Sequence, residues 1–175
     1  MESIEYRPET TPSLVLRNLR VGESIILNGA EHSVERIESG SEIGKQFGLQ
    51  INRDVPVYYL SGMSADGQGQ GGYQPDADVV VIYENNIDPT TLEHELIHAV
   101  EFKYQPTAGL LALYQKAKNI ITEQSFHEDG IYNFNFMKNI HEFLADGRTK
   151  LKPILIKEGL YNEFEKETAY IFDIK

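Results

Sequence analysis

The spacing of apolar residues along the chain changes close to residue 86, and this change restricts the possible folds more than any other feature of the sequence. Before it, apolar residues form short β-branched and aromatic runs, as in VPVYYL (55–60) and ADVVVIYEN (77–85), which are typical of strands. After it, apolar residues recur every three or four positions, which predicts helices. Strands followed by helices favour the α+β class.

The first half of the chain also contains turn signals. Asn28-Gly29 follows an apolar run and predicts a hairpin. His32, in this hairpin, is expected at the surface. Residues 41–48 are compatible with a short helix. The glycine-rich residues 61–75 are expected to lack regular structure.

The second half predicts four helices, the first of which is limited by Pro106 and should end near Tyr104. The helices are expected near residues 89–104, 107–124, 137–150 and 161–172. No internal repeat or long linker divides the chain. We therefore expect a single domain over residues 1–175, with 1–86 mainly strands and 87–175 mainly helices.

Composition narrows the possible partners. The net charge is −11, with only 16 Lys and Arg, so nucleic acid is not expected to bind. No apolar run approaches the ~18 residues of a membrane span, and the start does not resemble a secretory signal. There is no cysteine. We expect a cytoplasmic protein without membrane contact, although export by a route without a signal, or delivery as an effector, stays open. The oligomeric state is open too.

The sequence HELIH places two histidines four residues apart. On a helix, His94 and His98 lie on one face and can direct ring nitrogens at a single metal ion. Glu95 is rotated by about 100° and is better placed to accept a proton from water than to bind the metal. Leu96 and Ile97 are apolar, as a buried helix requires. Zn²⁺, one ion per chain, is the expected metal because it suits these ligands.

A catalytic zinc needs a third protein ligand. Glu142, in the sequence NIHEFLADG, is the preferred candidate, and Asp146 lies four residues later on the same helical face. Asp146 is expected to accept a hydrogen bond from a ligand histidine. His141 is the main rival for the third ligand, and His127 and Asp129 are weaker rivals.

His94-Glu95-x-x-His98 followed by Glu142-x-x-x-Asp146 resembles the zincin metallopeptidases whose third ligand is a glutamate, the gluzincins. HELIHAVE and EFLAD are also similar to compact lethal-factor-like domains and to metallopeptidase domains of bacterial effectors and phages. The resemblance covers roughly residues 77–150. It implies a twisted, mainly antiparallel sheet packed against the C-terminal helices. It also implies Zn²⁺, with both histidines and Glu142 as ligands and Glu95 as general base.

The resemblance further implies a polypeptide substrate that lies extended along an edge strand, which residues 78–84 match. In the lethal-factor-like group a tyrosine seven residues before the third ligand stabilises the oxyanion, but that position is Asn135 here. Tyr132 is the nearest substitute. The remaining candidates for this role are Tyr161, Tyr170, His127 and Arg148.

Two functions follow. The first is a zinc-dependent metalloendopeptidase that hydrolyses peptide bonds with water activated by zinc and Glu95. The second is a catalytically silent zincin-like binding or structural module that retains zinc. Because an inactivated module would usually have lost Glu95 or a ligand, the first is preferred. Substrate identity and biological process are not encoded in any motif.

Overall fold

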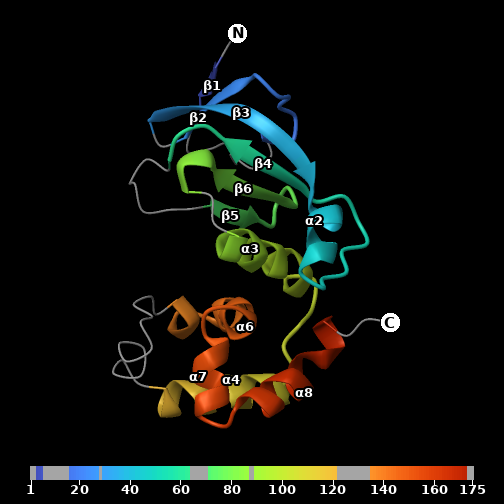
Figure 1. Cartoon of the computed structure of the whole chain (residues 1–175), viewed down its shortest axis with the longest axis vertical. Helices are drawn as coiled ribbons and strands as arrows, with labels where there is room; N and C mark the ends of the chain where they lie inside the picture. Colours follow the sequence, from blue (N-terminus) through green and yellow to red (C-terminus); the bar gives the residue numbers. More distant parts are fainter. Residues whose placement is uncertain are drawn as a thin grey trace. The chain divides into compact units, whose positions relative to one another are not determined.

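The computed structural model describes residues 3–5, 16–27, 29–63, 71–86, 89–121 and 135–172. Contacts group the chain into two compact units, Met1–Ala99 and Val100–Lys175, which are described one at a time (Figure 1). The first holds the strands and the second is helical, so the α+β class is confirmed. A single domain over residues 1–175 stays a prediction.

The first unit is built on one six-stranded sheet with the order β1-β2-β3-β4-β6-β5. β2–β3, β3–β4 and β5–β6 pair antiparallel, whereas β1–β2 and β4–β6 pair parallel, so the sheet is mixed. The strands are β1 (Ser3–Glu5), β2 (Ser24–Leu27), β3 (Ala30–Ser39), β4 (Pro56–Leu60), β5 (Gly71–Gln74) and β6 (Val79–Tyr83).

β6, which covers most of the edge strand expected at residues 78–84, does not lie at an edge of the sheet. β6 pairs with β4 on one side, through Val57↔Val80, and with β5 on the other, through Tyr73↔Val80. The expectation that a substrate pairs with residues 78–84 is therefore wrong, because the backbone groups of this strand are already used. β5 is the terminal strand of the sheet on this side. The expectation that residues 61–75 lack regular structure is likewise wrong for Gly71–Gln74.

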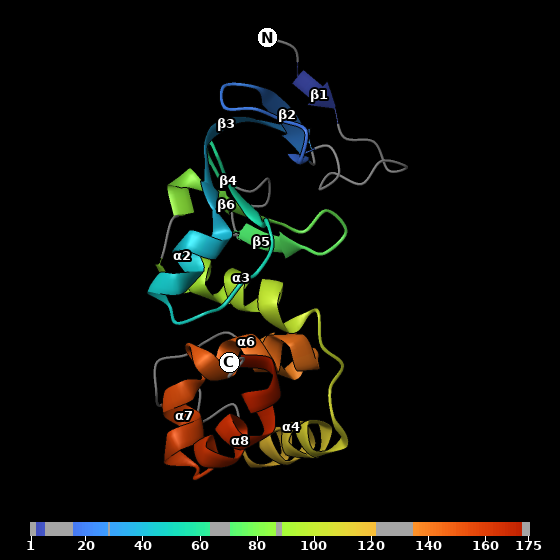
Figure 2. The same ribbon diagram turned by 90° about the vertical axis from the view of Figure 1, so that its right-hand side faces the viewer.

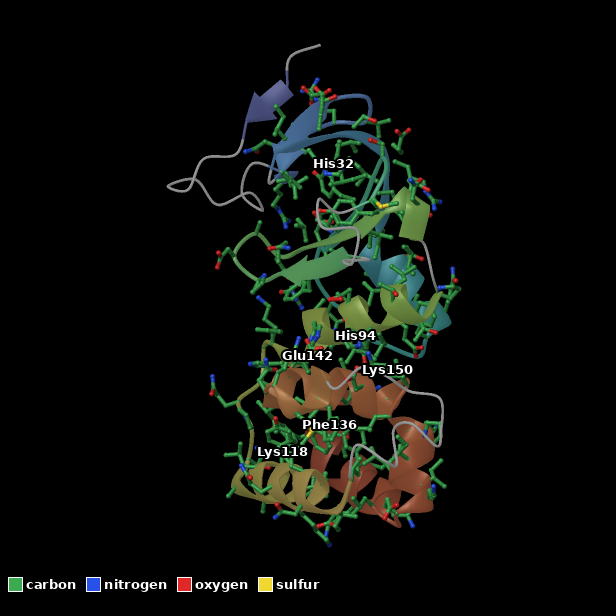
Figure 3. All side chains as sticks on the ribbon, turned by 90° about the vertical axis from the view of Figure 1, so that its left-hand side faces the viewer. His32, His94, Lys118, Phe136, Glu142 and Lys150 are labelled. Atoms are coloured by element: carbon green, nitrogen blue, oxygen red, sulfur yellow. The ribbon has the colours of Figure 1, made fainter. Side chains whose placement is uncertain are left out.

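The hairpin predicted at Asn28-Gly29 is present as β2 and β3, and Gly29 has a φ of 83°, which favours glycine. His32, on β3, is buried rather than exposed, with 3% of its surface accessible (Figure 3). Its Nδ1–H donates to the carbonyl of Ser61 at 2.8 Å, and its ring lies 5.1 Å from that of Tyr83.

Among the described residues, two α-helices belong to the sheet unit, α2 (Gly40–Gln46) and most of α3 (Pro89–Glu101), and the short 3-10 helix η1 (Glu84–Asn86) follows β6. Both views show α3 beside β5 (Figures 1 and 2). A Cβ on Gly40 would collide with the carbonyl oxygen of Val55 and lie 3.2 Å from Leu96, so glycine lets α2 approach the start of β4 and α3. The remaining core residues of this unit include Leu16, Ile25, Val34, Tyr58, Leu60, Val79 and Val81.

The second unit contains the other helices. They are α4 (Ala108–Ile120), α6 (Ile140–Arg148), α7 (Lys152–Lys157) and α8 (Tyr161–Phe172), with the short 3-10 helix η2 (Asn135–Met137). Side chains of Thr107 and Asn139 cap α4 and α6 by accepting from backbone N–H groups. α4 and α8 lie side by side (Figure 2). No helix of the described residues has the length and apolar character needed to cross a membrane.

Aromatic rings form the core of the helical unit. Phe143 lies 5.2 Å from Tyr114, 6.3 Å from Phe136 and 5.4 Å from Phe164, measured between ring centroids. Phe136, Phe143 and Phe164 are almost fully buried, and Figure 3 marks Phe136. This cluster fixes α6, so it also fixes the local position of Glu142.

Gly147→Ala should destabilise this unit. A Cβ at Gly147 would collide with the ring of Phe164, which has no room to retreat because it is buried. We expect a loss of about 1–3 kcal/mol in the free energy of unfolding, as for other overpacked cores. Urea unfolding would measure it. Phe164→Leu in the same chain should recover part of the loss, and additive effects of the two changes would contradict the proposed collision.

Candidate metal centre

α3 carries the two histidines of the predicted site. The helix begins at Pro89, and Leu96 and Ile97 are fully buried, which fixes the orientation of the helix on the sheet. His94 and His98 therefore share one face, with ring centroids 4.8 Å apart and ring planes at 84°. His98 is buried, whereas His94 is half-buried. The predicted pairing of the two histidines is present.

Glu95 contacts the sheet. Its Oε1 accepts a hydrogen bond of 3.1 Å from the backbone N–H of Tyr73, on β5. Tyr73 pairs with Val80 of β6. Backbone groups alternate in direction along an antiparallel strand, so an N–H directed at Glu95 faces away from β6. The carboxylate thus has a defined position beside the terminal strand.

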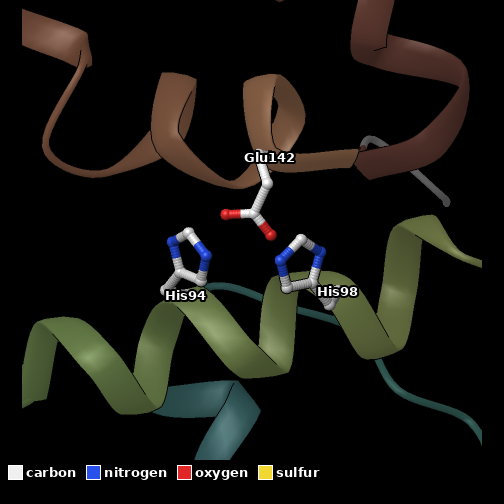
Figure 4. A group of neighbouring side chains, drawn as sticks. All are labelled: His94, His98 and Glu142. Atoms are coloured by element: carbon white, nitrogen blue, oxygen red, sulfur yellow. The ribbon is translucent and has the colours of Figure 1, made fainter. Parts of the chain in front are cut away.

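Three side chains form a group that could hold a metal ion, His94, His98 and Glu142 (Figure 4). One candidate ligand atom from each lies within 4.8 Å of the others. Glu95 does not belong to this group, in line with its predicted role outside the metal shell.

The donor set suits zinc. Two imidazoles and one carboxylate are the ligands of one class of catalytic zinc sites, which keep a fourth position open. Ligand atoms at ~2.0–2.2 Å from a tetrahedral ion lie about 3.3–3.6 Å from one another.

His141, the rival third ligand, has another partner. Its Nδ1–H donates to both carboxylate oxygens of Glu101, at 2.9 and 2.8 Å. The ring of Phe102 stacks on the imidazole with centroids 4.0 Å apart and planes at 8°. Glu101 is fully buried, so water competes little for this hydrogen bond. The arrangement orients His141 and leaves Glu142 as the acidic residue of the metal group.

Asp146 lies on α6 one turn after Glu142 and is 1% exposed. Its Oδ1 lies 3.8 Å from the ammonium nitrogen of Lys150, and its backbone carbonyl accepts from the N–H groups of Thr149 and Leu151. Its burial is unusual for an acidic residue. Acceptance of a hydrogen bond from a ligand histidine stays a prediction.

Several residues predicted from the sequence lie outside the described residues. They are Tyr132, the candidate for oxyanion stabilisation, and the weaker ligand candidates His127 and Asp129. Their predicted roles stay predictions.

The other candidates for oxyanion stabilisation have partners in the helical unit. The hydroxyl of Tyr170 donates to the carbonyl of Gln105 at 2.7 Å. The guanidinium carbon of Arg148 lies 4.2 Å from the centre of the Phe172 ring. The ring of Tyr161 stacks within its own helix, α8. These contacts give each side chain a packing role.

The sequence did not predict two contacts, the hydrogen bond from the Tyr73 N–H to Glu95 and the hydrogen bond between His141 and Glu101. The first involves a backbone group, which no residue pattern marks. A signal for the strand itself was present, since Pro75 and Asp76 follow Tyr73 as they would in a hairpin turn before β6. Glu101 looked like an ordinary acidic residue at the end of a helix.

Comparisons with known proteins found no match. No family model, no curated protein and no solved structure is similar to this chain. The zincin resemblance therefore depends on the HELIH and EFLAD residues and their geometry alone.

Proposed function

We propose that this chain is a zinc-dependent metalloendopeptidase of the gluzincin type. The observation that carries the proposal is the grouping of His94, His98 and Glu142, with Glu95 directly after His94 on the same helix. Such a division between ligands and an adjacent carboxylate is what hydrolysis at a metal centre requires. A structural zinc site would use four protein ligands, whereas this group supplies three among the residues that the structure describes.

In the proposed reaction, His94, His98 and Glu142 hold Zn²⁺, which lowers the pKa of water towards ~7 and polarises the scissile carbonyl when bound. Glu95 accepts the proton of the attacking water and passes it to the leaving amine. The Tyr73 N–H donates to the Glu95 carboxylate and orients it. Glu101 orients His141 next to Glu142.

β5 replaces residues 78–84 as the proposed strand for substrate pairing. It is terminal in the sheet, and the Tyr73 backbone faces away from β6 and lies next to Glu95. Because the Tyr73 N–H already donates to Glu95 Oε1, an extended polypeptide added to this edge would pair with the other main-chain groups of β5, and such pairing favours peptides over other substrates. β5 has only four residues, so side-chain contacts must supply most of the selectivity.

Digestion of a peptide library with purified protein, with and without a chelator, tests the function. We expect internal cleavage that stops with chelator and returns when Zn²⁺ is added. Tight zinc binding without cleavage of any peptide would support the silent module instead. Failure to bind zinc at all would overturn both.

A further inference from the structure

A single arginine joins the turn after β5 to α3. Arg53 donates from Nε to Asp78 Oδ2 at 2.5 Å and from Nη2 to Asp78 Oδ1 at 2.7 Å. Its Nη2 also donates to the backbone carbonyl of Ala99 at 2.6 Å. Ala99 lies one turn after Glu95 on the same helix. Arg53 therefore fixes Asp78 relative to the helix that carries Glu95.

Tyr73 is held at two points. Its hydroxyl donates to Asp78 Oδ1 at 2.6 Å, and its backbone N–H donates to Glu95 Oε1. Burial raises the pKa of Tyr73, and the hydrogen bond to Asp78 raises it further. The hydrogen bond to Asp78 also raises the pKa of Arg53, so both donors keep their protons. The ion pair is largely buried, with 30% of the Arg53 and 20% of the Asp78 side chain exposed.

The turn itself is also secured. Asp78 has a φ of 57°, a conformation that few residue types other than glycine, Asn and Asp adopt readily. Its N–H donates to the carbonyl of Gln74 at 2.9 Å. Arg17 donates to the carbonyls of Ala77 at 2.5 Å and of Asp78 at 3.0 Å. Two arginines of a chain with only 16 basic residues are thus used on one turn.

We infer that Arg53, Asp78 and Tyr73 form a positioning frame that holds the Tyr73 backbone N–H against Glu95 and so fixes the direction of the Glu95 carboxylate. The frame contains three members, and the N–H of Tyr73 contacts Glu95. The expected effect of the frame on catalysis rests on the proposed function, whereas its effect on the direction of the Glu95 carboxylate does not. A general base works only when its carboxylate meets the proton in the right place, and misplacement by about 1 Å can cost ~10²-fold in rate.

Arg53→Met and Tyr73→Phe test the frame. The first removes the ion pair and the bond to Ala99, and the second removes the hydroxyl that donates to Asp78. Arg36→Met is the matched control, since Arg36 pairs with Glu38 and Glu84 in the same unit without contact to β5. For each protein we would measure deuterium exchange of the Tyr73 amide by NMR, bound zinc, and kcat and KM for peptide cleavage.

Both frame variants should exchange the Tyr73 amide at least about tenfold faster than the control, while amides of the β4–β6 ladder keep their protection. Glu95→Ala, which removes the acceptor, gives the upper limit of this effect. Cleavage should fall about 10- to 100-fold in kcat, with zinc content and KM unchanged.

Unchanged Tyr73 exchange in both variants would overturn the frame, as would equal loss of protection throughout the sheet, which would indicate a purely structural role. If Arg53→Met does not fold, Tyr73→Phe alone decides. If the unaltered protein cleaves no peptide, the proposed function fails while the exchange data still decide whether the frame holds the N–H on Glu95.

Discussion

Glu95→Gln should abolish most hydrolysis and leave the metal in place. The amide keeps the shape of the carboxylate, and its oxygen can still accept from the Tyr73 N–H. It cannot accept the proton of the attacking water. We expect a fall of at least ~10²–10⁴-fold in kcat/KM, the usual contribution of general acid–base catalysis. Zinc should stay bound because Glu95 lies outside the metal group.

Metal content and peptide cleavage would be measured on the same preparation. His98→Ala is the companion variant, which should lose both metal and activity because two remaining ligands hold zinc poorly. A Glu95→Gln protein with full metal and undiminished turnover would remove Glu95 from the mechanism. The HELIH helix would then serve only to bind metal.

Glu142→Ala should lower zinc affinity far more than His141→Ala. Removal of the Glu142 carboxylate leaves two imidazole ligands. We expect the loss of zinc affinity to exceed the ~10–100-fold loss caused by changes to residues that contact metal ligands without binding the metal. His141→Ala removes a side chain held by Glu101 and should stay within that lower range. Zinc titration against a competing chelator would measure both.

Glu165→Ala is a suitable control because it removes an exposed acidic side chain of α8. It should leave zinc affinity unchanged. The reverse order, with metal lost in His141→Ala and kept in Glu142→Ala, would move the third ligand to His141. Equal retention in both variants would exclude each of them as a ligand.

Local signals predicted the helix that bears the histidines. The four-residue spacing of His94 and His98 and the apolar pair between them depend only on neighbouring residues, which is why the sequence was sufficient. Pro106 predicts an end near Tyr104, whereas α3 ends at Glu101. The buried pair of Glu101 with His141 coincides with this end, and it joins residues 40 positions apart.

Strand pairing was much less predictable. The apolar residues of β6 fit an edge or a centre equally well, because a run buried on both faces says nothing about neighbours in the sheet. β5 could not be predicted from the sequence because it begins with two glycines, and glycine is a weak strand former. His32 is polar and belongs to a hairpin, so surface exposure was a reasonable prediction. Its burial brings it into contact with distant residues, the carbonyl of Ser61 and the ring of Tyr83.

The central place of β6 in the sheet has a consequence for the order of folding. Its pairing with β5 closes a short turn, whereas its parallel pairing with β4 must close a much longer loop and carries a larger entropic cost. The hairpin can therefore form early, and the parallel pairing must follow it. Leu96 and Ile97 of α3 become buried only after the sheet has formed. During refolding, capture of a metal by the two histidines should lag behind the slow pairing step, and stopped-flow mixing with a zinc indicator would resolve that delay.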